Sequence, residues 1–313
     1  MKGMDQVLAV DIGGTKTAVG IVSAHGIVLA KDTAPTPRGD PEAVRDCVAA
    51  LAARVLGRAG PVQSAGLALP GVVDHSRKLL LCSPSSGWRD VPFVRMIEAA
   101  LDVPVTADND VKACAWAEAH FGLALGYENF FWMTISTGIG GAAVEGGKVV
   151  VGKRAMAGEI GHLVVNPGGE QCACGNRGCL EAEAAGPAWR RKALRLVQDD
   201  PASALARLGT DAVDAEVVAR LARSGDESCL AVVRNVGLML ARGIAAVENI
   251  LDPQVIVVGG GVARSLDILL PVISESLPSL ILAGSERAID IRPSMLGYDA
   301  ALVGAAALAL YPY

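Results

Sequence analysis

The sequence predicts an α/β protein of two domains, on the basis of a duplicated strand pattern, its length and its composition. Two passages, residues 7–30 and 130–151, each contain a strand, a Gly-rich turn, a second strand, another Gly turn and a third strand. The 313 residues are enough to bury two hydrophobic cores. Apolar residues make up 51% of the chain and aromatic residues only 4%, which is typical of tightly packed α/β proteins. The duplication predicts two domains of common plan that face one another.

Capping patterns predict where two of the helices begin. Asp40 is a suitable N-cap with a proline at the first helical position, and the apolar pattern continues through residues 41–57. Ser224-x-x-Glu227 reads as a capping box that opens a longer helix with a buried apolar stripe. That helix is expected to stop at Asp252-Pro253. A buried strand at residues 255–258 and an apolar helix at 300–310 are expected to follow.

Charge and composition argue against several classes of partner. The net charge is −5 and the pI is about 5.5, whereas binding to nucleic acid needs a basic surface. No uninterrupted apolar run is long enough to span a bilayer, and the residues before the first strand are too few for a signal peptide. Four scattered cysteines read as small hydrophobic residues of a reducing compartment: Cys47, Cys82, Cys114 and Cys229. We therefore expect a cytoplasmic protein without nucleic-acid or membrane partners.

A dense cluster of metal-ligand residues lies in the middle of the chain. Its members are His162, Cys172, Cys174 and Cys179. Three thiolates and an imidazole form the tetrahedral ligand set that Zn²⁺ prefers, and the intervening glycines let a short backbone wrap round an ion. Four protein ligands leave no open position, so the sequence predicts a structural zinc. The alternative is three reduced thiols and an unrelated histidine in a Gly-rich loop.

Two Gly-rich turns are candidates for binding phosphate. The first contains Gly13, Gly14, Thr15 and Lys16 and lacks the spacing of a Walker A loop. Its glycines would let backbone N–H groups approach phosphate oxygens, and Asp11 would support hydrated Mg²⁺. The second turn is Thr137-Gly138, at the corresponding place in the second passage. An ordinary tight turn is the alternative for each, although two such turns from two domains suit the phosphates of one nucleotide.

Asn109 and Asp110 stand between a predicted strand and a predicted helix. Either residue suits a helix N-cap, which is the purely structural interpretation. A carboxylate at a helix N-terminus is favoured in its ionised form, so Asp110 is expected to be a weak base at neutral pH. Phosphoryl transfer tolerates a weak base because its loose transition state depends mainly on alignment and charge neutralisation. Asp110 is therefore the candidate catalytic base for a substrate hydroxyl, and Asn109 beside it is expected to orient that substrate.

Several motifs together resemble the ROK family of sugar kinases and sugar-responsive repressors. The motifs are Asp11-Ile12-Gly13-Gly14-Thr15-Lys16, Pro70-Gly71-Val72-Val73-Asp74, Asn109-Asp110, Ser136-Thr137-Gly138-Ile139-Gly140-Gly141, Glu159-x-Gly161-His162, Cys172-x-Cys174-Gly175-x-x-Gly178-Cys179-x-Glu181 and Gly259-Gly260-Gly261. The resemblance covers nearly the whole chain. It implies the two-domain fold of actin-like ATPases and hexokinases, a duplicated ribonuclease H-like core with a cleft between the domains. It places the domains at residues 1–108, joined by the C-terminal helix 299–313, and at 109–298, which carries the zinc loop.

The resemblance also implies the ligands and some of the residues that bind them. ATP with Mg²⁺ would bind at the two Gly-rich turns, and the adenosine would lie against Gly260 and Gly261. A Gly-rich connection from strand to helix is the alternative for that last segment. The sugar would contact Gly71, Asn109, Asp110, Gly138, Glu159, His162 and Glu181. Without the resemblance, a surface carboxylate is the alternative interpretation of each of the two glutamates.

The sequence therefore predicts an ATP-dependent hexose kinase that acts on the 6-hydroxyl, with glucose as the preferred sugar. Family glucokinases often show Pro-Asn-Leu before Gly-Trp, whereas this chain has Ser85-Ser86 in place of Asn-Leu. N-acetylmannosamine, N-acetylglucosamine and fructose therefore remain open as substrates. A sugar-sensing regulator without kinase activity is the alternative from another class, but only ten residues precede Asp11, too few for a DNA-binding domain. Members of the family are commonly homodimers or homotetramers, which is the expectation here too.

Overall fold

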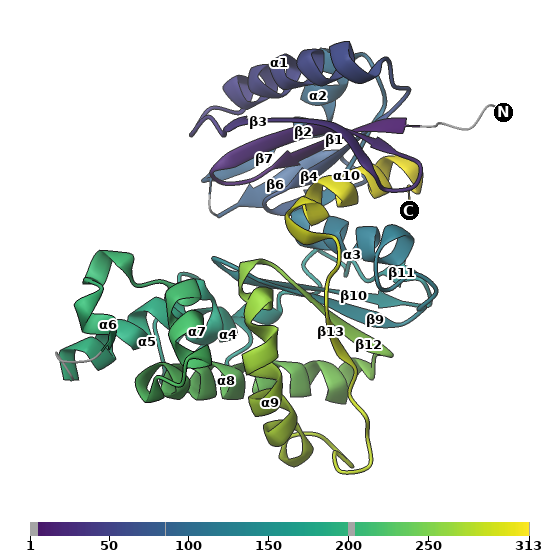
Figure 1. The fold of residues 1–313 in the computed structure, drawn as a ribbon. Coiled ribbons are helices and arrows are strands. Elements are labelled where there is room, and N and C mark those ends of the chain that lie inside the picture. Colours follow the sequence, from purple (N-terminus) through teal and green to yellow (C-terminus); the bar gives the residue numbers. More distant parts are fainter. Residues whose placement is uncertain (1–5, 85, 200–203, 313) are drawn as a thin grey trace. The chain divides into compact units, whose positions relative to one another are not determined.

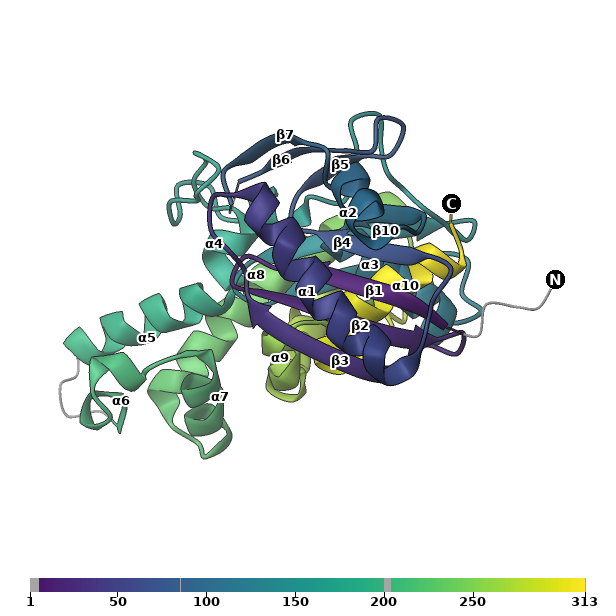
Figure 2. The same cartoon turned by 90° about the horizontal axis from the view of Figure 1, so that it is seen from above.

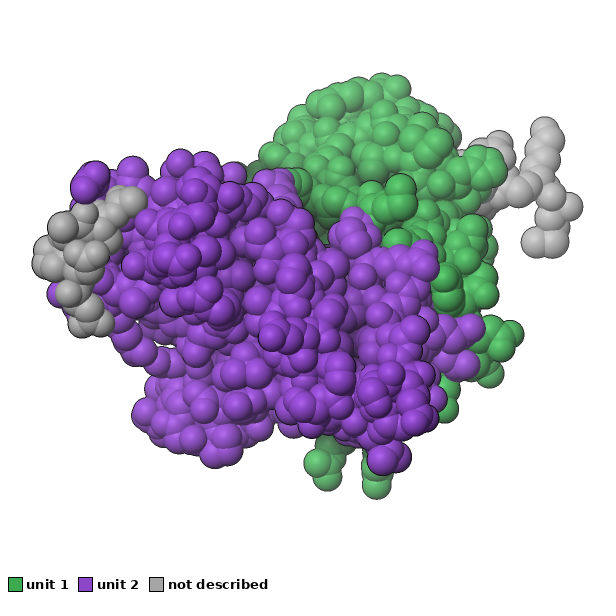
Figure 3. Space-filling model, turned by 60° about the horizontal axis from the view of Figure 1, so that its bottom comes forward, with its two compact units in different colours: residues 1–128, 142–157, 295–313 green, residues 129–141, 158–294 purple. Residues whose placement is uncertain are grey.

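The computed structural model describes residues 6–84, 86–199 and 204–312, which separate into two compact units (Figure 3). Unit 1 contains residues 1–128, 142–157 and 295–313, and unit 2 contains residues 129–141 and 158–294. The predicted boundary was at residue 108, whereas in the structure residues 109–128 belong to unit 1. The C-terminal segment also belongs to unit 1. Asn109 and Asp110 are thus part of the first unit rather than the first residues of the second. Ser85 lies outside the described residues.

Unit 1 is built on a five-stranded sheet of order β3-β2-β1-β4-β8. Its strands are β1 (Gln6–Ile12), β2 (Lys16–Ser23), β3 (Val28–Pro35), β4 (Ala65–Leu69) and β8 (Val105–Asn109). β1, β2 and β3 form an antiparallel meander, while β1, β4 and β8 run parallel. Parallel strands end at the same edge of a sheet. The residues that follow β1, β4 and β8 are therefore brought together, and these are the predicted site residues of this unit.

Helices cover both faces of the unit 1 sheet. Helices α1 (Pro41–Ala59) and α2 (Phe93–Leu101) pack on one face, and α3 (Asp110–Phe121) and α10 (Ala300–Leu310) lie on the other (Figures 1 and 2). A small sheet extends the unit with β5 (Val72–Asp74), β6 (Leu79–Ser83) and β7 (Trp88–Val91). Helix α10 lies so close to β4 that a Cβ atom on Gly66 would be 1.6 Å from the carbonyl oxygen of Ala305. The apolar C-terminal segment is therefore a core helix of unit 1.

A second five-stranded sheet repeats the plan, with order β11-β10-β9-β12-β13. Its strands are β9 (Phe130–Ile135), β10 (Ile139–Glu145), β11 (Lys148–Val149), β12 (Val255–Gly259) and β13 (Ile291–Pro293). β12 runs parallel to both β9 and β13. The helices of unit 2 are α4 (Leu180–Ala184), α5 (Gly186–Asp199), α6 (Ala204–Arg207), α7 (Ala215–Arg223), α8 (Glu227–Leu251) and α9 (Leu266–Ser276). The two sheets share one strand plan, as the duplicated sequence pattern predicts.

Helix α8 begins differently from the prediction. Its N-cap is Asp226, whose carboxylate accepts a hydrogen bond of 2.9 Å from the backbone N–H of Cys229. Ser224, which the prediction made the cap, instead ends α7. The capping-box prediction was therefore wrong, because an equally good cap two residues later is the one used. The predicted stop is confirmed, since Asp252 caps the end of α8 in a left-handed conformation with φ of 47°.

Among the described residues, α8 is the one helix that is long and apolar enough to cross a membrane, judged by length and hydropathy alone. However, 61% of its most apolar 18-residue stretch is buried inside the protein. It packs against α4, α5, α7 and α9. The apolar residues of α8 are thus explained by the core of unit 2.

Candidate active site

Asn109 organises the carboxyl edge of the unit 1 sheet. Its side-chain oxygen accepts hydrogen bonds from the backbone N–H groups of Val111 (3.0 Å) and Lys112 (3.3 Å), so Asn109 is the N-cap of α3. Its amide nitrogen donates to the carbonyl oxygen of Gly71 (3.1 Å) and to Oδ1 of Asp110 (2.9 Å). The predicted capping role of Asn109 is confirmed, and the helix starts at Asp110. One side chain thus joins the ends of β4 and β8 and fixes the neighbouring carboxylate.

Asp110 is held at the N-terminus of α3 and has a second carboxylate nearby. Its Oδ1 also accepts a hydrogen bond of 2.9 Å from the backbone N–H of Val111. Asp11, at the end of β1, has its pKa raised to about 7, first by burial and then by the negative charge of Asp110, against the opposing effects of Lys16 and Lys31. Two carboxylates that repel each other at a partly buried edge provide the oxygen ligands that suit a hydrated Mg²⁺ ion.

The first Gly-rich turn joins β1 to β2 and is fastened to the segment that follows β3. The backbone N–H of Gly13 donates to the carbonyl oxygen of Lys16 (3.0 Å), while Gly14, Thr15 and Lys16 are exposed. Thr36 closes the turn: its hydroxyl donates to the carbonyl oxygen of Gly13 (2.8 Å) and its N–H donates to that of Thr15 (3.0 Å). A Cβ atom on Gly14 would meet nothing within 4 Å. The exposed part of the turn is therefore open to an incoming group.

In unit 2, two glycine segments meet at the ends of the parallel strands β9 and β12. The turn after β9 is closed by a hydrogen bond of 2.8 Å from Ser136 N–H to the carbonyl oxygen of Gly138, and Thr137 is exposed at its tip. After β12, Gly260 has a φ of 87°, and a Cβ atom there would be 2.4 Å from the carbonyl oxygen of Ile135. Only glycine fits that position. The predicted segments Thr137-Gly138 and Gly260-Gly261 thus lie at one edge of this sheet.

The four predicted zinc ligands come together in unit 2. Their ligand atoms all lie within 4.8 Å of one another. Cys172 Sγ is 3.7 Å from His162 Nδ1, and Cys174 Sγ is 3.6 Å from Cys179 Sγ. Tetrahedral Zn–S bonds would place two sulfur atoms about 3.8 Å apart. Burial, and then the neighbouring thiols of Cys174 and Cys172, raise the pKa of Cys179 to about 12. A cation bound by this sulfur would favour its ionised form. The residues fit a structural Zn²⁺.

The two predicted sugar-binding glutamates flank this cluster. Glu159 precedes the short helix η1 (Ile160–His162) and is exposed. Glu181 lies on α4, and its Oε2 accepts a hydrogen bond of 3.0 Å from the backbone N–H of Ile139. A Cβ atom on Gly138 would be 2.5 Å from that same oxygen. Glu181 is therefore tied to the Thr137-Gly138 turn, and the absence of a side chain at Gly138 leaves room for its carboxylate.

Two buried carboxylates that support the sites are absent from the sequence predictions. Glu183 is 2% exposed, and its Oε1 accepts hydrogen bonds from the backbone N–H of Glu170 (2.7 Å) and from the amide of Asn166 (3.1 Å). Both donors lie on the loop that carries the predicted zinc ligands.

The second of these carboxylates, Asp108, is fully buried in unit 1. Its Oδ1 is 3.1 Å from His75 Nε2 and accepts a 2.6 Å hydrogen bond from the N–H of Asn109. The hydrogen bond to Asp108 is the largest cause that raises the pKa of His75. No sequence spacing links these partners, so only the folded chain reveals them.

The site residues thus form one group in each unit. Unit 1 holds Asp11, the turn of residues 13–16, Gly71, Asn109 and Asp110, while the four predicted zinc ligands, the two glutamates and the other glycine segments are in unit 2. The model of the family described as ROK matches residues 7–311. The chain belongs to the ROK family.

The chain is similar to sugar kinases that act on different sugars. A "Glucokinase" of Streptomyces coelicolor is 34% identical over 317 aligned residues, which cover 99% of each chain. An "N-acetylmannosamine kinase" of Escherichia fergusonii is also 34% identical, with coverage of 96% of this chain and 97% of the relative. A solved structure of a ROK family glucokinase from Streptomyces griseus, in complex with glucose and AMPPNP, has a TM-score of 0.85 and 32% identity. It covers 97% of this chain and 99% of that one.

Proposed function

We propose that this protein is an ATP-dependent hexose kinase that phosphorylates the 6-hydroxyl of a sugar, with glucose as the preferred substrate. The observation that carries the proposal is the position of Asp110, fixed at the N-terminus of α3 by Asn109 and Val111 and close enough to Asp11 to raise its pKa. A capping role alone explains Asn109 but does not require a second carboxylate at the same edge. The similarity to kinases of glucose and of N-acetylmannosamine supports the same reaction class.

In the proposed reaction, the sugar 6-hydroxyl donates a hydrogen bond to the carboxylate of Asp110. The hydroxyl oxygen attacks the γ-phosphorus of ATP, the bond from that phosphorus to the β,γ-bridging oxygen breaks, and ADP leaves. The proton of the hydroxyl passes to Asp110. Bound Mg²⁺ would neutralise the phosphate charge, and Asp11 is the residue of this edge that would support it. Asn109 keeps Asp110 in place through the 2.9 Å hydrogen bond between their side chains.

The residues of unit 2 are proposed to supply recognition. Glu159, His162 and Glu181 would accept hydrogen bonds from sugar hydroxyls, and Zn²⁺ on His162 and the three cysteines would keep this loop folded. Glu181 uses Oε2 for the backbone of Ile139. Its other oxygen would be the one directed to the sugar. Thr137 and Gly138 would contact the phosphates, and Gly260 and Gly261 the adenosine.

The test is ADP release with ATP, Mg²⁺ and one sugar at a time. We expect glucose to have the highest kcat/KM among glucose, mannose, fructose, N-acetylglucosamine and N-acetylmannosamine. We also expect measurable activity on at least one other hexose, because serine residues stand where a bulkier Asn-Leu pair is expected. Ser85→Asn should narrow this range. If an N-acetylated sugar has a higher kcat/KM than glucose, the assignment of glucose as the preferred substrate is wrong, but the kinase assignment stands. If no sugar stimulates ADP release, the kinase assignment is wrong and a sugar-sensing role is favoured.

A further inference from the structure

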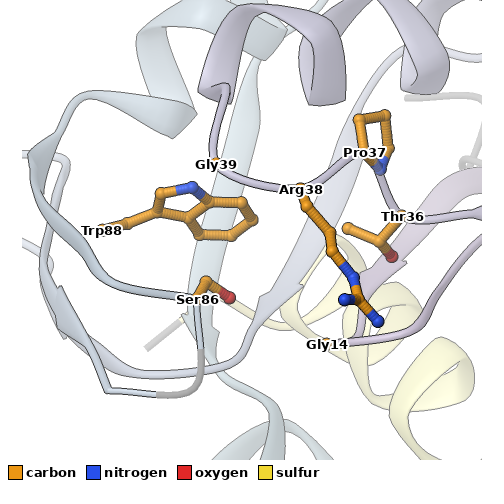
Figure 4. Close-up of a pocket in the computed structure, with 7 residues that line it drawn as sticks. All are labelled: Gly14, Thr36, Pro37, Arg38, Gly39, Ser86 and Trp88. Atoms are coloured by element: carbon orange, nitrogen blue, oxygen red, sulfur yellow. The ribbon is translucent and has the colours of Figure 1, made fainter.

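Unit 1 contains a cavity next to the first Gly-rich turn, and Gly14 of that turn is one of the residues that line it. Its volume is about 380 Å³, and seven residues line it: Gly14, Thr36, Pro37, Arg38, Gly39, Ser86 and Trp88. Cavities of this size are typical of small-molecule sites. Figure 4 shows Arg38 extending toward Gly14, while Ser86 and Trp88 line the opposite side. The cavity thus brings together the segments that follow β1 and β3 and the hairpin that leads into β7.

The chemistry of the lining favours an anion with several acceptor oxygens. Among the described residues that line the cavity, Arg38 is the one charged residue and none is acidic. Among the described residues, no ion pair involves Arg38, whose side chain is exposed. The guanidinium is always charged, and its planar fork matches the oxygens of a phosphate group. The hydroxyls of Thr36 and Ser86 are further polar groups of the lining.

The position of Arg38 is coupled to the Gly-rich turn. Two residues before it, Thr36 is buried, its hydroxyl is 2.9 Å from that of Thr17, and it makes the two hydrogen bonds to Gly13 and Thr15 described above. Pro37 then restricts the backbone between Thr36 and Arg38. The chain therefore holds a flexible cationic side chain on a fixed backbone segment beside the exposed residues of the turn.

We propose that this cavity is a phosphate-binding subsite in which Arg38 is the specificity-determining residue. Its ligand is a terminal phosphate, brought either by the nucleotide donor or by the phosphorylated sugar. The proposal rests on the proposed function for the identity of these two sources, but phosphate binding by the cavity can be measured without any turnover. Arg38 then acts as a cationic contact in addition to Lys16 of the turn.

The first experiment measures the binding of inorganic phosphate to the full-length protein by isothermal titration calorimetry. Arg38→Gln should weaken binding about tenfold, and Arg38→Lys by less, because lysine keeps the charge and loses the bidentate fork. Arg95→Gln is the matched control, since Arg95 is an exposed arginine of α2 in the same unit. It should bind phosphate as the wild type does. Thermal melting should be unchanged in all three variants because both side chains are exposed.

The second experiment separates the two sources by titrating Mg²⁺-ATP and, separately, glucose 6-phosphate. A loss of affinity in Arg38→Gln for ATP alone identifies the donor as the source, and a loss for glucose 6-phosphate alone identifies the product. Glucose itself should bind equally well to both proteins. Unchanged phosphate affinity in Arg38→Gln, or an equal loss in Arg95→Gln, would overturn the subsite. If the wild-type protein binds phosphate but phosphorylates no sugar, the proposed kinase function is refuted and the phosphate subsite is not.

Discussion

Replacing Asp110 by asparagine removes the proposed base while preserving the local structure. Both hydrogen bonds to Oδ1 of Asp110, from Val111 N–H and from the amide of Asn109, are 2.9 Å long and come from N–H donors. The side-chain oxygen of an asparagine is able to accept both. We therefore expect the free energy of unfolding to change by less than about 0.5 kcal/mol. Loss of general-base catalysis should lower kcat by about 10²-fold or more, which corresponds to about 2.7 kcal/mol.

The same substitution has a second consequence that is independent of turnover. The charge of Asp110 is the second-largest cause of the raised pKa of Asp11, after burial. Asp110→Asn should therefore lower the pKa of Asp11 from its value of about 7. Carboxyl ¹³C chemical shifts measured across a pH titration of the Mg²⁺-free protein give this pKa directly. An unchanged pKa would show that the two carboxylates are farther apart in solution than in the structure.

Steady-state ADP release and sugar binding should be measured on the same preparations. We expect the affinity for glucose to stay within a few-fold of the wild-type value, because hydrogen bonds to other residues remain. Asp46→Asn is a suitable control, since Asp46 is an exposed carboxylate on α1 of the same unit. It should leave kcat unchanged. Turnover of Asp110→Asn near the wild-type rate would refute the assignment of the base, and a large loss of stability would refute the structural reasoning.

Three further predictions concern the metal, the pH dependence and the packing. Purified protein should contain one zinc per chain by elemental analysis. Cys174→Ser should lose the metal and lower the melting temperature although Cys174 is exposed, because the substitution removes a metal ligand rather than packing. Wild-type protein without zinc would contradict this prediction. Because the folded pKa of Asp11 is raised, its ionisation costs the folded state more as the pH rises from about 4 to about 7. Asp11→Asn should thus raise the free energy of unfolding in Mg²⁺-free buffer by about 2 kcal/mol above pH 7 and very little at pH 4. The value of about 2 kcal/mol already allows for the partial exposure of this side chain, which weakens the effect. Urea titrations that show no such pH dependence would argue against a buried charge. Gly66→Ala would place a new Cβ atom 1.6 Å from the carbonyl oxygen of Ala305, and it should lower the free energy of unfolding by about 3 kcal/mol. Gly57→Ala, near the C-terminal end of α1 where a Cβ atom would meet nothing within 4 Å, should raise it by about 0.5–1 kcal/mol. Equal effects of the two substitutions in denaturant melts would be inconsistent with this packing.

Local patterns were sufficient to predict much of this protein. The duplicated strand meanders, the helix that starts after Asp40 and the buried strand at residues 255–258 all appear in the structure, since each depends on propensities and periodicities within a short window. The clustering of the four predicted zinc ligands was also predictable, because all four lie within one short segment and have ligand-like residue types. Where two caps competed, at Ser224 and Asp226, the local pattern did not discriminate between them.

Tertiary structure alone decided which distant residues share a site. The parallel pairing of β1, β4 and β8 brings Asp11, Gly71 and Asn109 to one edge, although these residues are far apart in the sequence. The same pairing places Asp11 where burial, and then the charge of Asp110, raise its pKa. The pairs His75–Asp108 and Glu183–Glu170, and the approach of Arg38 to the Gly-rich turn, have no sequence spacing that predicts them. They depend on long-range packing, in which a contact forms only when remote elements bury their apolar faces together.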